Sequence, residues 1–153
     1  MNYQTVIVKK ILPATCEEVF DAWLDPEGMC EWMRPGPVMD CKVFMEPRVG
    51  GRFRIIMSGP GGEIVNTGTF RILDRPVKLQ FTWISSRWKN QETLVTVELA
   101  QRASDCEIVL THSKFPLDQL AEQLVAGWNQ ILEKLFCRLT SSADMRRPGP
   151  DHS

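Results

Sequence analysis

The clearest candidate for a chemical role in this sequence is His112, which stands in the run Leu110-Thr-His-Ser113. An imidazole titrates near neutral pH, so a partly buried His112 could carry a proton in a reaction. No serine or cysteine nucleophile motif surrounds it, and the acidic residue that follows, Asp118, falls on a predicted helix. Two interpretations stay open: a general base, or a structural residue that fixes the start of that helix. The other histidine, His152, lies in the C-terminal tail.

Cysteines and carboxylates give no metal-ligand spacing. The five cysteines include no CxxC pair, and an odd number scattered along a chain is typical of reduced thiols: Cys16, Cys30, Cys41, Cys106 and Cys137. Acidic residues between positions 17 and 27 are explained by the preference of helix N-termini for negative charge. We therefore expect neither a metal nor another cofactor, and a cytoplasmic protein.

Charge and glycine patterns exclude further classes of function. The net charge of -1 and the absence of an aromatic-basic module argue against a nucleic-acid partner. Gly59-Pro-Gly-Gly62 is glycine-rich, but it joins two predicted strands and lacks the helix N-terminus that a phosphate loop needs. No apolar stretch has the length of a membrane span, so we expect no membrane partner.

The elements that must position these residues follow from periodicity. Alternating patterns predict a first strand at 3–11 and six later strands, separated by turn residues, at 40–45, 51–57, 63–73, 78–84, 92–100 and 105–112. Two short helices lie between the first and second strands. Thr15-Cys16-Glu17-Glu18 fits a capping box at the start of one, and Asp25-Pro26 starts the other.

A long helix closes the chain, predicted from Pro116 to about Leu139. Leucines, Trp128 and Ile131 recur at spacings of three and four, which gives the helix one apolar stripe. Gly127 interrupts this stripe at a cost of about 1 kcal/mol relative to alanine, so we expect that a strand approaches there or a pocket opens there. Residues 1–139 are thus predicted to be a single domain, and 140–153 a disordered tail.

The chain resembles the family named after the activator of the heat-shock-chaperone ATPase, within the START-like (helix-grip) superfamily that includes the birch-pollen allergen and aromatic polyketide cyclases. The resemblance is carried, in the family's order, by Pro13-Ala14, Val19-Phe-Asp-Ala-Trp23, Trp32, Val49-Gly-Gly-Arg-Phe53, Gly68-Thr-Phe70, Leu79-Gln-Phe-Thr-Trp83, Val95-Thr-Val97, Leu110-Thr-His-Ser113 and Gly127-Trp128. It implies an α+β fold, in which a strongly curved antiparallel sheet of about seven strands wraps around the C-terminal helix. Trp32-Met-Arg-Pro35 departs from the pattern of many relatives, close to the expected pocket mouth.

The resemblance also implies an apolar ligand cavity between sheet and helix. Large apolar residues on the expected inner faces are its candidate lining: Phe20, Trp23, Trp32, Phe53, Ile55, Phe70, Phe81, Trp83, Leu124, Gly127 and Trp128. The alternative is that these side chains simply fill the core.

We therefore predict that the protein binds a small, largely apolar molecule, with no assigned catalysis. One alternative is a protein-interaction or chaperone-accessory module that uses the outer face of the sheet or Trp88, which lies on a predicted hairpin tip. The other is a cyclase- or hydrolase-like enzyme that uses His112 as a base. Nothing in the sequence requires more than a monomer or a weak dimer.

Overall fold

The computed structural model describes residues 3–116 and 121–146, without the side chains of residues 3, 88, 115, 116 and 142–146. The elements are, in chain order, β1 (Tyr3–Leu12), α1 (Cys16–Ala22), α2 (Pro26–Trp32), β2 (Asp40–Met45), β3 (Arg52–Gly59), β4 (Gly62–Asp74), β5 (Lys78–Ser85), the 3-10 turn η1 (Ser86–Trp88), β6 (Glu92–Arg102), β7 (Asp105–Pro116) and α3 (Ala121–Arg146). This confirms the predicted fold class and the order of its strands and helices. Only η1 was not expected.

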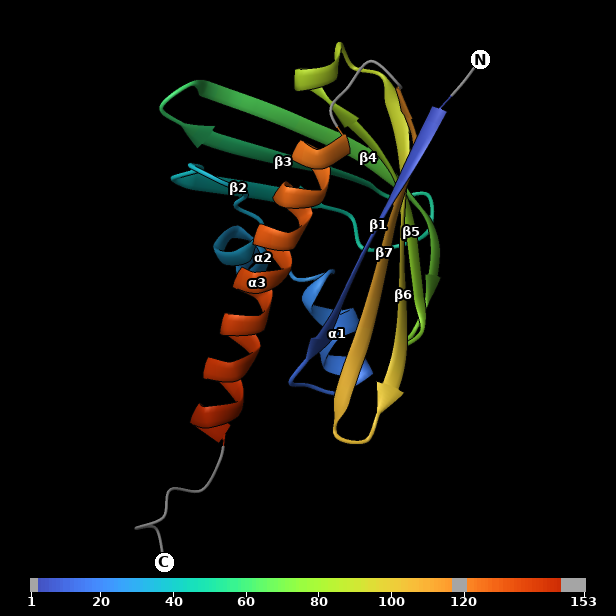
Figure 1. Ribbon diagram of the computed structural model, residues 1–153, viewed down its shortest axis with the longest axis vertical. Helices are drawn as coiled ribbons and strands as arrows, with labels where there is room; N and C mark the ends of the chain where they lie inside the picture. Colours follow the sequence, from blue (N-terminus) through green and yellow to red (C-terminus); the bar gives the residue numbers. More distant parts are fainter. Residues whose placement is uncertain (1–2, 117–120, 147–153) are drawn as a thin grey trace, which may run out of the picture.

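The seven strands form one antiparallel sheet in the order β1-β7-β6-β5-β4-β3-β2. Figure 1 shows that the sheet is strongly bent, with β1, β7 and β6 running along the long axis of the molecule and β2, β3 and β4 turned across it. The helices lie on the inner side of this bend, and α3 runs along the open side (Figure 1). The inward-facing positions of the strands therefore point at α3, where the core is built.

Gly68 on β4 permits the close approach of neighbouring groups where the sheet bends. A Cβ atom at this position would lie 1.9 Å from the carbonyl oxygen of Thr82 and 2.4 Å from the ring of Phe53. Phe53 is the direct partner of Gly68 across the β3–β4 pair, so its ring occupies the space that a side chain at 68 would need. Glycine is required here because backbone and an aromatic ring both meet the missing Cβ.

The capping box predicted at α1 is confirmed. The Glu18 amide donates to Thr15 Oγ1 at 3.1 Å, and the Thr15 amide donates to Glu18 Oε1 at 3.2 Å. Asp25 caps α2 in the same sense, accepting from the amide of Gly28 at 3.2 Å. These caps fix the first turns of two short helices whose ends carry Trp23 and Trp32 into the core.

The boundaries of the closing helix differ from the prediction at both ends. Pro116 is the last residue of β7, paired with Tyr3 of β1, and does not start a helix; a strand end tolerates proline because the missing amide donor costs little there. At the other end α3 continues to Arg146 rather than stopping near Leu139. The prediction ended the helix where the apolar stripe ends, whereas the first helix-breaking residue after Leu139 is Pro148. Residues 117–120 and 147–153, including Asp118 and His152, lie outside the described part of the chain.

Candidate ligand-binding site

An aromatic cluster lies between the sheet and the helices. Its members come from α1, α2, α3 and the inner face of β3–β5: Trp23, Trp32, Phe53, Phe70, Phe81, Trp83 and Trp128. Neighbouring ring centroids lie 5.0 Å apart for Trp23–Trp32, 5.4 Å for Phe53–Phe81 and 5.4 Å for Trp83–Trp128. Such offset and edge-on pairs stabilise a core beyond their buried area. The rings therefore pack against one another, which is the arrangement that the core-filling alternative describes.

A small cavity of about 10 Å³ remains inside the cluster. Its walls are hydrophobic side chains: Trp23, Met29, Met33, Met45, Phe53, Ile55, Phe70, Phe81 and Trp83. Binding pockets for drug-sized molecules measure roughly 300–1,000 Å³, so this cavity has room for about one water molecule. A larger guest fits only if the walls move.

The cavity brings together part of the predicted set of lining residues. Trp23, Phe53, Ile55, Phe70, Phe81 and Trp83 are among its walls, whereas Phe20, Trp32, Leu124, Gly127 and Trp128 are not. The sequence-based set omitted Met29, Met33 and Met45. Their hydrophobic character was visible, but their place at the cavity depends on where α2 and β2 cross the sheet, which periodicity does not give.

His112 is fully buried and joins α3 to the sheet through a chain of hydrogen bonds. The indole Nε1 of Trp128 donates to His112 Nδ1 at 3.0 Å. Because Nδ1 is an acceptor, the imidazole proton is on Nε2, which lies 2.7 Å from Thr93 Oγ1. The Thr93 hydroxyl in turn donates to the carbonyl oxygen of Trp83 at 2.6 Å. We call these four groups the seam; they connect the middle of α3 to β7, β6 and β5.

Burial lowers the pKa of His112 from 6.5 to about 3, so its imidazole is neutral at physiological pH. His112 is not among the cavity walls. These observations favour the structural interpretation over the general base. Within the described residues, the contact of His112 with α3 is made at Trp128.

Two other indoles lack the partner that Trp128 has. The Nε1 atoms of Trp23 and Trp32 are buried and meet no hydrogen-bond acceptor among the described residues. Each of these side chains is 1 % exposed. A buried donor without an acceptor is costly, and such groups are few in folded proteins. We call these two residues, with the adjoining cavity, the hollow.

Among the described residues no strand approaches the missing Cβ of Gly127, so the first of the two reasons expected for this glycine is not met. Within the described part of the chain, the only neighbour that a Cβ at 127 would meet within 4 Å is the Pro35 side chain, at the ordinary contact distance of 3.7 Å. The segment around Pro35 is tied to α3, since the Gly36 amide donates to Gln130 Oε1 at 2.5 Å and Lys134 Nζ donates to the Arg34 carbonyl. The departure from the family pattern at 32–35 therefore lies against the closing helix.

A larger groove of about 660 Å³ lies at the sheet and is open to solvent; we call it the outer groove. Outward-facing side chains of β2–β5 take part in lining it, among them Phe44, Arg52, Arg54, Thr67, Thr69 and Ile84. Phe44 is 57 % exposed, and within the described ranges neither Arg52 nor Arg54 forms an ion pair. This outer groove thus combines an exposed aromatic ring with positive charge. The side chain of Trp88 lies outside the described residues.

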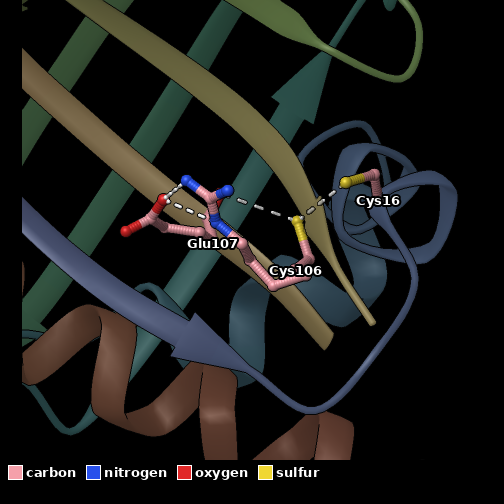
Figure 2. Close-up of polar contacts among 4 residues, drawn as sticks. Cys16, Cys106 and Glu107 are labelled. Atoms are coloured by element: carbon pink, nitrogen blue, oxygen red, sulfur yellow. Dashed lines mark hydrogen bonds and ion pairs between the residues drawn. The ribbon is translucent and has the colours of Figure 1, made fainter. Parts of the chain in front are cut away.

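Two of the cysteines, Cys16 and Cys106, form a buried pair. Figure 2 shows Cys16 at the start of α1 and Cys106 on β7 with their sulfur atoms facing each other, 3.2 Å apart. Both thiols are free and buried, and burial together with the hydrogen bond from Cys16 raises the pKa of Cys106 to about 12. Cys106 therefore stays protonated and is a poor nucleophile.

Two searches of the described residues were negative. No three or more His, Cys, Asp or Glu side chains in this part of the chain are placed to hold a metal ion together. Nor does any helix within residues 3–116 and 121–146 combine the length and apolar character needed to cross a membrane.

Comparison with known structures gives close matches to the fold. A protein of Chromobacterium violaceum superposes with a TM-score of 0.80 at 24% identity, covering 88% of this chain and 96% of its own. A protein of Mesorhizobium loti gives 0.74 at 25% identity, covering 92% and 99%. CalU16 of Micromonospora echinospora gives 0.68 at 21% identity, covering 94% and 80%. No curated protein sequence matches the chain.

The sequence pattern of one protein family covers most of the chain. This family is described as Activator of Hsp90 ATPase homolog 1-like protein, and its pattern matches residues 13–139. The matched range runs from the residue after β1 through the sheet and most of α3, which includes the seam and the hollow. The chain therefore belongs to the Activator of Hsp90 ATPase homolog 1-like family, with its START-like helix-grip fold.

Proposed function

We propose that the protein binds a small, largely apolar molecule in the hollow, between the sheet and the helices. The observation that carries this proposal is a cavity inside the aromatic cluster with three methionines in its walls, Met29, Met33 and Met45. Methionine is unbranched and has three rotatable bonds, so it repacks around a guest more readily than the aromatic rings do. The pocket of about 10 Å³ is then the closed form of a site that opens as these side chains move aside.

Methionine methyl groups give a direct test. With ¹³C-methyl-methionine label, α-methylstyrene is expected to shift the resonances of Met29, Met33 and Met45. The resonance of Met39, which is 71 % exposed and is not a cavity wall, is the internal control. Native mass spectrometry of protein from its own host tests the same proposal without a chosen probe. No retained molecule and no methyl shift at a saturating concentration of the probe would contradict it.

The outer groove supports a second candidate, a protein-interaction role with an acidic partner surface. Phe44, Arg52 and Arg54 offer an aromatic anchor beside two guanidinium groups that are free to pair with carboxylates. The family description names an activator of the Hsp90 ATPase, which makes an Hsp90-class chaperone the partner to test. The ATPase rate of such a chaperone is expected to rise with the protein and to return to its basal value with Arg54→Glu.

A lysine on the same sheet but outside this groove provides the matched control. Lys78→Glu makes the same charge change at a residue that does not line the groove, and it should leave any stimulation unchanged. An ATPase rate that does not respond to the wild-type protein, or that responds equally to wild type and Arg54→Glu, would remove this candidate.

A further inference from the structure

The two unpaired indoles of the hollow need an explanation that the cavity walls do not provide. An indole N–H can only donate a hydrogen bond, and Trp23 and Trp32 both bury this donor without an acceptor among the described residues. By contrast, the buried indole N–H of Trp128 donates to His112 Nδ1 at 3.0 Å. Both of these unpaired donors come from the helical segment, Trp23 at the end of α1 and Trp32 at the end of α2.

The two donors belong to indoles in edge-on contact, of which Trp23 borders the cavity and Trp32 is not one of its walls. The ring centroids of Trp23 and Trp32 lie 5.0 Å apart with an interplanar angle of 74°. Trp23 and Trp83 are the two indole side chains among the walls of the cavity, and every other wall is an aliphatic, thioether or phenyl side chain. The cavity's side chains thus supply hydrogen-bond donation and no strong acceptor, so an acceptor must come from whatever occupies the site.

We propose that the ligand carries a carbonyl oxygen that accepts a hydrogen bond from the indole of Trp23 and, once the cavity walls have moved aside, from the neighbouring indole of Trp32. This inference rests on the proposed function and specifies the class of ligand: a small apolar molecule that bears a ketone or ester group. Trp23 and Trp32 are the residues that orient it. The carbonyl removes the cost of the buried donors, while the apolar body of the ligand replaces contacts with the methionines.

The chemistry of the walls excludes two neighbouring ligand classes. A carboxylate would enter a site with no Lys or Arg among its walls, and an unpaired buried charge is far more costly than an unpaired donor. An alcohol would bring its own O–H donor into a site whose side chains offer no strong acceptor, so it would satisfy one group and leave another unpaired. A neutral carbonyl compound without a donor brings neither a charge nor an unpaired donor into the site, so it matches the walls.

A matched pair of probes tests this inference. Acetophenone and α-methylstyrene have nearly the same shape, but the first has a carbonyl oxygen where the second has a CH₂ group. We expect acetophenone to bind about tenfold more tightly in calorimetry, a difference of about 1.4 kcal/mol, because only its carbonyl oxygen accepts a hydrogen bond from the buried donor. Benzoate, which has a similar size and one negative charge, should bind more weakly than either.

Indole ¹H–¹⁵N resonances of the wild-type protein provide a second measurement that needs no variant. Acetophenone is expected to move the N–H protons of Trp23 and Trp32 downfield, and α-methylstyrene is not. The N–H proton of Trp128 should keep its shift with both probes because it already bonds His112. In Trp23→Phe, where it folds, the advantage of acetophenone should fall.

The outcomes separate the two proposals. Equal affinities for acetophenone and α-methylstyrene, or indole resonances that acetophenone leaves unchanged, would overturn the carbonyl inference while the apolar site stands. If neither probe binds and no methionine methyl group shifts, both proposals are overturned. Indole protons that are already far downfield in the free protein would show a water in the acceptor's place; if acetophenone does not displace it, the inference is also overturned.

Discussion

The seam and the hollow belong to the same aromatic cluster, with the rings of Trp23 and Trp128 6.4 Å apart, and they differ in whether the buried indole N–H has an acceptor. Trp128, Trp23 and Trp32 are all buried, at 3 %, 1 % and 1 % exposure. In the seam the indole donor has an acceptor. From there a chain of hydrogen bonds runs through His112 and Thr93 to the backbone carbonyl of Trp83. In the hollow the donors end without an acceptor among the described residues, beside the cavity.

This difference shows how a polar group can serve either the fold or a guest. A fully satisfied chain of hydrogen bonds specifies one position of α3 on the sheet, because any shift would leave buried donors and acceptors unpaired. Unpaired donors have the opposite effect on specificity. They raise the free energy of the closed state and favour the binding of a partner that supplies an acceptor.

The largest effect should come from removing the indole donor in each region. Trp128→Phe, Trp23→Phe and Trp32→Phe make the same change at sites of similar burial, so their packing costs are comparable. Trp128→Phe also deprives His112 Nδ1 of its donor, whereas the other two remove a donor that has no acceptor. We expect Trp128→Phe to lower the free energy of unfolding by about 2 kcal/mol more than either other variant. Urea titration measures the difference, and three equal losses would break the contrast.

The second effect is the dependence of stability on pH through the seam. The unfolded chain binds a proton at His112 with a pKa near 6.5, whereas the folded state binds it only near pH 3. Between these values the unfolded state holds more protons, so stability falls as the pH falls below 6.5. From pH 7.5 to 5.5 this amounts to about 1.4 kcal/mol, since one pKa unit corresponds to about 1.4 kcal/mol.

The chain offers a matched control for this titration, because it contains only two histidines. His152→Ala should keep the loss of stability between pH 7.5 and 5.5, and His112→Asn should remove most of it. Urea midpoints at several pH values give the slope. A slope that persists in His112→Asn would show that another group is responsible.

The sequence predicted the elements well and the site in part, for physical reasons that particular residues illustrate. Alternation and caps are local, so the strand with Phe81 and Trp83 and the helix capped by Thr15 could be identified correctly. The seam joins Thr93, His112 and Trp128, which are brought together only by the pairing of β6 with β7 and the docking of α3. No local pattern encodes such a contact. The same holds for the two unpaired indoles, because an absent partner can be recognised only in three dimensions.

The smallest effect concerns the glycine that precedes Trp128 in α3. Gly127 would meet only the Pro35 side chain, at 3.7 Å, if it carried a Cβ, so Gly127→Ala should be accommodated without movement of the seam. Alanine restricts the unfolded chain and favours the helix, and we expect the free energy of unfolding to rise by about 0.5–1 kcal/mol. Gly68→Ala is the matched opposite, because its methyl group would lie 1.9 Å from the Thr82 carbonyl oxygen and should destabilise the sheet. Thermal unfolding of the two variants decides the matter. If Gly127→Ala destabilises the protein as Gly68→Ala does, α3 must approach its neighbours more closely than the seam's hydrogen bonds require, and the docking of the helix would depend on shape as much as on His112.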